Sequence, residues 1–189
     1  MRVIGGELKG RTYSGKIPKG VRPTSELVRE SLFNTLNNLI EFDGINVLDL
    51  CAGTGALGFE TISRGADYCC FVELNARVAA LIKDISRHFD ISAGKFKTVN
   101  LDVAKFLQNT NNICGGIKFD IIFFDPPYEA GIYELVLNQL ATLEIFSTQS
   151  LIVVEHSTRT EIAIPENFDI IKQKKYGETA IAILTLAEN

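Results

Sequence analysis

Asp125-Pro126-Pro127-Tyr128 places a carboxylate, two prolines and an aromatic ring directly after the apolar segment 119–124. Proline has no N–H to donate and restricts the backbone of the residue before it, so this run predicts a rigid strand end with free carbonyl groups. Such acceptors can hold the N–H groups of an exocyclic amine on a nucleobase, while the tyrosine ring stacks on the base. Because that amine is a poor nucleophile, the chemistry would consist mainly of positioning. The alternative is a structural proline turn that ends in an exposed aspartate.

A glycine-rich turn follows the apolar segment 47–50. Gly53, Gly55 and Gly58 match the pattern G-x-G-x-x-G, in which glycine lets the backbone approach a ligand. Glu73 lies 20 residues after Gly53, where an acid can bind ribose hydroxyls. The turn and the acid predict an adenosine-containing ligand. They do not decide whether that ligand is a nicotinamide dinucleotide. A dehydrogenase has no use for the 125–128 run, which favours S-adenosylmethionine as the methyl donor.

The elements that would position these residues follow from hydrophobic periodicity. Short apolar runs rich in β-branched and aromatic residues alternate with helical patterns, which is typical of a parallel sheet covered on both faces. We expect strands at 46–51, 68–73, 96–101, 119–124 and 150–155, and helices at 56–64, 75–89, 102–109 and 132–143. Residues 167–186 read as two strands joined near 176–178, a loop short enough only for antiparallel neighbours. The predicted fold class is α/β, with a mostly parallel seven-stranded sheet and a C-terminal antiparallel hairpin.

The N-terminal segment differs in composition from the rest. Residues 1–22 hold six basic residues and one acidic residue, a net charge of +5, whereas the whole chain carries −4. We expect residues 1–23 to form a small basic β-hairpin or extended arm, attached to a single domain over residues 24–189. The alternative is that this charged segment is an arm exposed to solvent without a binding role. Thr24 or Ser25 can cap a helix that runs to about residue 40. Its buried face is expected to hold Leu27, Val28, Ser31, Leu32, Thr35, Leu36 and Leu39.

Composition limits the remaining classes of function. The chain of 189 residues has 46% hydrophobic and 22% charged residues, which is typical of one globular domain. Four cysteines without C-x-x-C spacing and two scattered histidines predict reduced cysteines, no disulfide scaffold and no metal site. No apolar run approaches the ~20 residues of a membrane span, and no secretory signal opens the chain. We expect a cytoplasmic monomer without membrane contact.

Taken together, these motifs resemble a known family. Residues 47–60, VLDLCAGTGALGFE, combined with the 125–128 run look like class I methyltransferases with a Rossmann-like fold that methylate amino groups. Residues 2–11, RVIGGELKGR, and the stretches 22–24 and 28–34 narrow the resemblance to the RsmD family, and it extends to 176–179. That family methylates the N2 amine of guanine 966 in 16S ribosomal RNA. Adenine-N6 methyltransferases of DNA share the 125–128 run, and some relatives carry Asn where this chain has Asp125.

The resemblance implies roles for particular positions. Cofactor binding would fall to the glycine turn and to the ends of three strands: Asp49, Ala52, Gly53, Gly55, Glu73, Leu74, Asp102 and Val103. Asp49 would lie near the ammonium group and Glu73 at the ribose, and Asp102 would meet the adenine amine unless it is an ordinary helix cap. The catalytic residues would be Asp125, Pro126, Pro127 and Tyr128. Contacts to 16S ribosomal RNA in the small ribosomal subunit would come from Arg2, Lys9, Arg11 and Arg22.

Three other functions remain open at this point. An adenine-N6 methyltransferase of DNA would ordinarily carry a target-recognition domain, for which this chain has no room. A non-catalytic RNA-binding assembly factor would have no need of an intact 125–128 run. A nicotinamide-dependent dehydrogenase would bind a reduced nicotinamide and have no affinity for S-adenosylmethionine.

Overall fold

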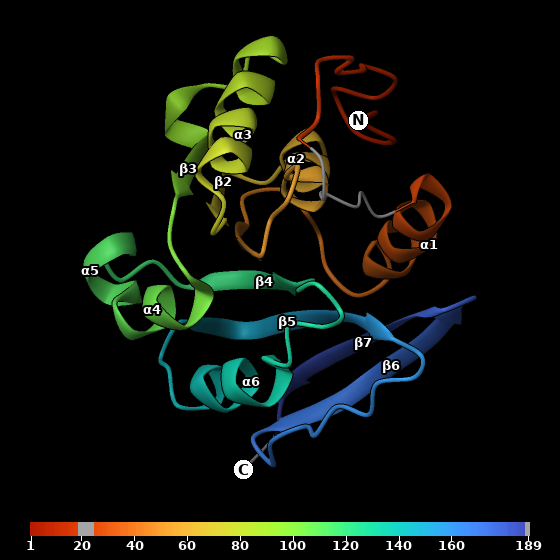
Figure 1. Ribbon diagram of the computed structural model, residues 1–189, viewed down its shortest axis with the longest axis vertical. Helices are drawn as coiled ribbons and strands as arrows, with labels where there is room; N and C mark the ends of the chain where they lie inside the picture. The colour runs from red at the N-terminus through yellow and green to blue at the C-terminus, as the bar shows by residue number, and fades with distance from the viewer. Residues whose placement is uncertain (19–24, 188–189) are drawn as a thin grey trace.

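The protein is an α/β sandwich built on one seven-stranded sheet (Figure 1). The computed structural model describes residues 1–18 and 25–187. Its elements in chain order are α1 (Glu26–Leu36), β1 (Asn46–Leu50), α2 (Ala56–Ser63), β2 (Tyr68–Val72), α3 (Ala76–His88), the 3₁₀ turn η1 (Ala93–Lys95), β3 (Phe96–Val99), α4 (Val103–Gln108), α5 (Thr110–Cys114), β4 (Phe119–Phe124), α6 (Tyr133–Ala141), β5 (Phe146–Ser157), β6 (Phe168–Tyr176) and β7 (Thr179–Leu186). The predicted Rossmann-like fold class is confirmed.

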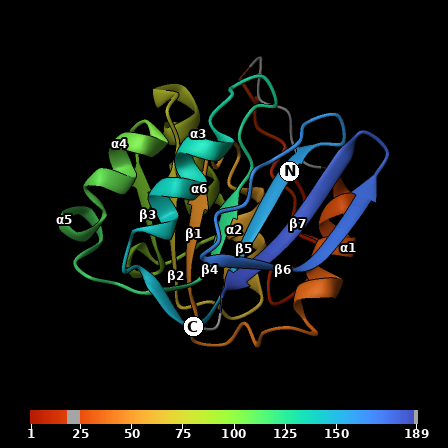
Figure 2. The ribbon, with the colours of Figure 1, turned by 90° about the horizontal axis from the view of Figure 1, so that it is seen from below.

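The sheet has the strand order β3-β2-β1-β4-β5-β7-β6, which can be followed from left to right in Figure 2. The first five strands pair in parallel, and β7 runs antiparallel between β5 and β6. The predicted C-terminal hairpin is therefore present, with β7 as the inner strand. The order reverses between β1 and β4, and ligands of open α/β sheets bind outside the carboxyl ends of strands at such a point.

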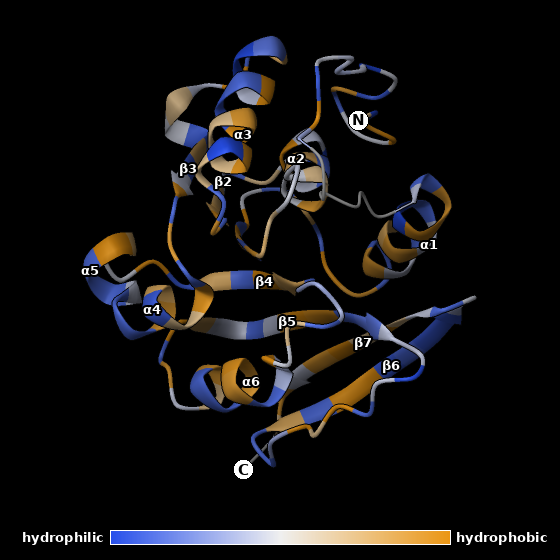
Figure 3. Cartoon of the chain, viewed as in Figure 1, coloured by the Kyte–Doolittle hydropathy of each residue, from blue (hydrophilic) through white to orange (hydrophobic). Residues whose placement is uncertain are grey.

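Two hydrophobic cores lie on the two faces of the sheet. Helices α1, α2 and α3 pack on one face around Phe33, Phe59 and Phe71, and α4, α5 and α6 pack on the other around Phe106 and Phe124. Figure 3 shows the resulting pattern, with apolar central strands and hydrophilic residues on the outer sides of the helices. Because helices cover both faces of the sheet, β1 and β4 are mostly apolar, with Asp49 and Asp120 as the acidic exceptions.

The first helix is shorter than the periodicity predicted. Ser25 caps it by accepting a hydrogen bond from Val28 N at 3.2 Å, but the helix ends at Leu36. Leu39, which lies beyond that end, is 42% exposed, and Leu27, at the margin of the buried stripe, is 74% exposed. Both residues were wrongly predicted to be buried. The helix α5, the turn η1 and the first residues of β5 were not predicted, because they are short or carry no periodic signal.

The N-terminal segment is attached to α2 through a buried charge. Val3 N donates to Arg11 O at 3.0 Å, and one antiparallel bridge joins Arg2 to Thr12 in the segment predicted to be a small β-hairpin or an extended arm. Glu60 in α2 is fully buried; its Oε2 accepts from Ile4 N at 2.8 Å, and its Oε1 pairs with Arg64 at 2.8 Å. A buried carboxylate needs such partners, so Glu60 fixes residues 1–13 against the domain.

The third glycine of the turn gives a test of the packing between α2 and β2. A methyl group on Gly58 would lie 2.3 Å from Phe71 and 2.6 Å from Cys69, whereas one on Gly94 would meet only Ser92 Oγ at 3.9 Å. Gly58→Ala should therefore lower the free energy of unfolding by about 1–3 kcal/mol despite the better helix propensity of alanine. Urea unfolding followed by circular dichroism measures the change. Gly94→Ala is the matched control, and equal stability of the two variants would contradict this packing.

Candidate functional site

The site lies at the carboxyl edge of the parallel strands. Leu50 of β1 pairs with Val72 of β2 and with Phe124 of β4, and the pairing continues from Val72 to Val99 and from Phe124 to Val154. The residues that follow these five paired positions therefore lie along one edge of the sheet, in the order Asn100, Glu73, Cys51, Asp125 and Glu155. The first four come just after their strands, and Glu155 lies within β5, near its end at Ser157. Four of the five are polar or charged, and three of them are acidic.

The glycine-rich turn is a tight left-handed segment at the centre of this edge. Cys51, Gly53 and Gly55 have φ values of 59°, 54° and 73°, and Gly55 N donates to Ala52 O at 2.7 Å. Glycine adopts such angles without steric cost, whereas Cys51 stores strain of about 1–3 kcal/mol. Burial raises the pKa of the Cys51 thiol well above its usual range, with Glu73 and Asp125 as further causes. These neighbouring charges reflect the meeting of three strand ends.

Glu73 joins this turn to the loop after β2. Its Oε2 accepts from Gly53 N at 2.9 Å, and its Oε1 accepts from Asn75 N at 2.8 Å. Asn100 Nδ2 donates to the carbonyl oxygens of Glu73 and Leu74 at 2.8 and 2.7 Å. The half-buried carboxylate is thus fixed in orientation, while Leu74 beside it is 68% exposed.

Asp49 lies beneath the turn. It is 2% exposed, and its Oδ2 accepts from Gly58 N at 3.1 Å in the first turn of α2. Burial raises the pKa of Asp49 to about 8, the hydrogen bond from Gly58 opposes this rise, and the charge of Glu73 adds to it. Asp49 therefore supports the glycine turn from below.

Asp102 caps helix α4. Its Oδ1 accepts from Ala104 N at 3.0 Å and from Lys105 N at 3.2 Å. Within the chain, Asp102 therefore acts as the helix N-cap that the sequence offered as the alternative. The residue is half-buried and follows β3 by three positions, while Val103 is buried in the core.

The 125–128 loop extends from β4 across the ends of β5 and β7. Asp125 is half-buried, Pro126 is buried, and Pro127 O accepts from Ala130 N at 2.8 Å. The hydroxyl of Tyr128 is hydrogen-bonded to Thr179 Oγ1 at 2.8 Å and donates to Glu155 Oε1 at 3.3 Å. Burial, together with the charges of Glu155 and Asp125, raises the pKa of Tyr128. The orientation of the tyrosine ring is therefore fixed by the hydrogen bonds of its hydroxyl group as well as by its backbone.

The predicted RNA-binding residues within 1–18 lie away from this edge. Arg11 donates to Phe89 O at 2.9 Å and to His88 O at 3.0 Å, and it pairs with Asp90 at 3.2 Å, so its guanidinium holds the C-terminal end of α3. Because α3 begins at the carboxyl edge and has 13 residues, this end lies roughly 20 Å along the helix from that edge. Arg2 and Lys9 are exposed on the same segment, and Arg22 lies outside the described residues.

Several residues of the edge were missed by sequence reasoning. Glu155, Asn100 and Thr179 have no motif of their own, and Cys51 gave no sign of its left-handed backbone. Glu155 follows the apolar run 151–154 as Glu73 follows 69–72, so a systematic reading of strand ends would have found it.

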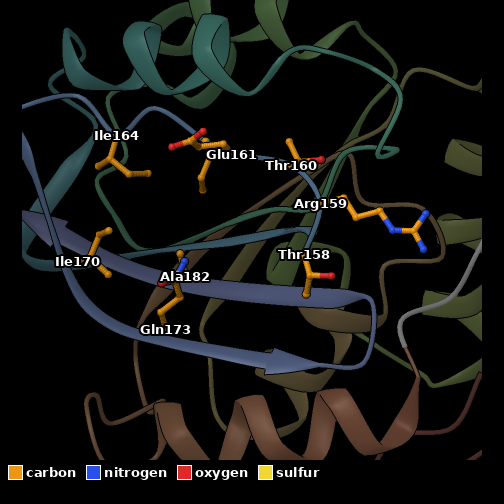
Figure 4. A pocket seen from close by; sticks show the side chains of 9 residues that line it. Thr158, Arg159, Thr160, Glu161, Ile164, Ile170, Gln173 and Ala182 are labelled. Carbon is orange, nitrogen blue, oxygen red and sulfur yellow. The ribbon is translucent and has the colours of Figure 1, made fainter.

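A separate cavity of about 310 Å³ lies between residues 158–164 and the strands β6 and β7 (Figure 4). Thr160, Glu161 and Ile164 line one side, with Ile170, Gln173 and Ala182 opposite. None of the residues predicted for the site lines it. Within 1–18 and 25–187, no cluster of three or more potential metal ligands occurs, and no helix is both long and apolar enough to cross a membrane.

Comparison with known proteins identifies the family. A family model described as "Conserved hypothetical protein 95" matches residues 1–185. The chain belongs to this family. The chain is similar to "Ribosomal RNA small subunit methyltransferase D" of Escherichia coli, with 33% identity over 95% of this chain and 87% of that protein. "Putative rRNA methyltransferase YlbH" of Bacillus subtilis is 32% identical over 97% of both chains. The resemblance to the RsmD family is confirmed.

Solved structures agree with this assignment. A putative methyltransferase of Escherichia coli, yhhF, superposes with a TM-score of 0.84 and 30% identity over 98% of this chain and 97% of that one. A second putative methyltransferase, solved in complex with SAH, has a TM-score of 0.68 at 18% identity and covers 85% of this chain and 48% of its own. This second structure supports the fold alone.

The raised pKa of Asp49 predicts a pH dependence of stability. Between about pH 4 and about pH 8 the folded chain keeps a proton on Asp49 that the unfolded chain releases, so the free energy of unfolding should fall as the pH rises through this window. Asp49→Asn should flatten that fall. Urea unfolding at several pH values measures it, with Asp67→Asn at an exposed carboxylate as the control. Parallel pH profiles for wild type and Asp49→Asn would contradict a protonated Asp49.

Proposed function

We propose that this protein is an S-adenosylmethionine-dependent methyltransferase of ribosomal RNA. The family relatives named as ribosomal RNA methyltransferases support the reaction class and the substrate. The observation that carries the proposal is the pairing of Leu50 with Phe124, which makes Cys51 and Asp125 neighbours at the carboxyl edge. The turn proposed to bind the cofactor and the loop proposed to bind the amine are thereby neighbours.

The residues around the turn fit an adenosine-containing ligand. Each oxygen of Glu73 accepts one backbone N–H and keeps the capacity for a second hydrogen bond, which suits two ribose hydroxyls. Asp102 has Oδ2 besides the capping Oδ1, and exposed Leu74 offers apolar surface to a purine. Ala52, Gly53 and Gly55 would contact the amino-acid part, and Asp49 would act through the turn that it supports. Bound S-adenosylmethionine supplies an electrophilic methyl group.

The finer part of the proposal is the acceptor atom, the exocyclic N2 amine of guanine 966 in 16S ribosomal RNA. The carboxylate of Asp125 and the carbonyl of Pro126 would accept the N–H groups of that amine and thus orient its nitrogen. Pro127 stiffens the loop, and Tyr128 would stack on the base, a contact worth about 1–3 kcal/mol. Because the Tyr128 hydroxyl is tethered to Thr179, the ring pays little conformational entropy on binding.

The nucleoside composition of ribosomal RNA tests the function directly. Cells that lack the gene should lose N2-methylguanine at one site of 16S ribosomal RNA, as seen by mass spectrometry of nuclease digests. Restoring the gene should restore the mark. An unchanged content of N2-methylguanine, or a loss of N6-methyladenine in its place, would refute the assignment to guanine N2.

Asp125 gives the test at the level of the site. Asp125→Ala should lower kcat by roughly 100-fold or more while the affinity for S-adenosylmethionine changes little, because its contact is to the base. Asp125→Asn keeps an acceptor oxygen and should retain more activity. Calorimetric binding and single-turnover methylation separate the two effects, and wild-type turnover in Asp125→Ala would remove this residue from the mechanism.

The exposed basic residues Arg2 and Lys9 are proposed to contact the RNA backbone, together with Arg22, whereas Arg11 is engaged by α3. Lys9→Gln should weaken RNA binding and reduce the slope of log K against log salt by about 1. Filter binding over a range of salt concentrations measures the slope, with exposed Lys95→Gln as the control. Identical slopes for Lys9→Gln and wild type would show that Lys9 makes no contact with the RNA backbone.

A further inference from the structure

Glu155 is a second carboxylate beside Asp125 that no motif accounts for. It follows Val154, which pairs with Phe124, so the two acids occupy adjacent positions, Asp125 just after β4 and Glu155 near the end of β5, which runs to Ser157. Glu155 is only 8% exposed. A buried carboxylate is costly unless it has polar partners, so the groups around Glu155 indicate what it can do.

The contacts of Glu155 fix it in place. Its backbone carbonyl accepts from Tyr133 Oη at 3.2 Å, and its Oε1 accepts from Tyr128 Oη at 3.3 Å. Glu155 also pairs with Ile181 of β7, so its backbone is held from that side by the sheet. The side chain is thus linked to the tyrosine that is proposed to stack on the base, at the rim of the proposed base-binding space.

The chemistry of guanine matches two adjacent carboxylates. On its Watson–Crick edge the N2 amine and N1–H are neighbouring donors, and enzymes that take up a flipped base read that edge through hydrogen bonds. Asp125 would accept from the amine, and a second acceptor next to it would meet N1–H. Adenine has an unprotonated N1, whose lone pair would face the carboxylate and be repelled.

We propose that Glu155 determines specificity by accepting the N1–H of the target guanine. This inference rests on the proposed function and adds the group that distinguishes guanine from purines whose N1 carries no hydrogen. A purely structural role, in which Glu155 only anchors Tyr128, makes a different prediction: that role would affect all base substrates alike.

The test compares two bases that share the reactive amine. 2-Aminopurine keeps the 2-amino group of guanine, but its N1 carries no hydrogen and is an acceptor. Next to the amine, the two bases therefore differ only in the proposed contact between N1 and Glu155. 16S ribosomal RNA is prepared by ligation with either guanine or 2-aminopurine at the target position. Each RNA is tested as a substrate both as free RNA and after assembly into small subunits. Wild type should prefer guanine in kcat/KM by roughly 10- to 100-fold, the value of one good base contact.

Glu155→Gln should reduce this preference to less than about threefold, because its amide can donate to the N1 of 2-aminopurine and can still accept from Tyr128. Tyr128→Phe is the matched control: it removes the hydroxyl contact and leaves the carboxylate, so the preference should stay at the wild-type value while turnover falls. Glu155→Asp shortens the side chain by one methylene and withdraws the carboxylate from N1–H, so it should also lower the preference, and it replaces the Gln variant if that protein does not fold.

The outcomes separate the two proposals. If wild type methylates guanine N2 but shows no preference over 2-aminopurine, or if Glu155→Gln keeps the full preference, the role of Glu155 is overturned and the function stands. If Tyr128→Phe loses the preference as Glu155→Gln does, the tether and not the carboxylate reads the base, which also overturns it. If wild type transfers no methyl group to guanine N2, the proposed function itself fails.

Discussion

The parallel pairing of β1 with β4 is the constraint on which the site depends. The two strands are far apart in sequence, yet the register of Leu50 with Phe124 brings the glycine turn after one beside the proline loop after the other. Neither segment could do the proposed chemistry alone, because a turn that binds a donor needs an oriented acceptor next to it. The hydrophobic cores on both faces keep that register, since a slip would misplace every buried side chain of the two strands.

Much of the edge is organised by hydrogen bonds within the chain before any ligand is considered. Glu73 holds Gly53 N and Asn75 N, and Tyr128 is tethered to Thr179. Such preorganisation lowers the entropy that substrate binding must overcome, and it keeps polar groups oriented at the place where an amine would be held. The site is thus stiff at its rim and strained at Cys51, where the backbone turns sharply.

The sequence predicted the parts of this arrangement that local pattern controls. Apolar runs and glycine spacing located the central strands, the turn and Glu73, because each signal lies within a few residues. Contacts over long separations were out of reach. The contacts of Arg11 with the end of α3 and of Glu155 with Tyr128 join residues far apart in sequence and leave no local signal. Leu27 shows a further limit, because periodicity does not fix the width of a buried face.

A crystal structure of the protein with S-adenosylhomocysteine tests the central claim most directly. The account predicts the ligand across the turn at Gly53 and Gly55, its ribose hydroxyls on Glu73, and its sulfur facing the space beside Asp125. A ligand bound in the cavity under residues 158–164, or one whose sulfur points away from the 125–128 loop, would contradict the account.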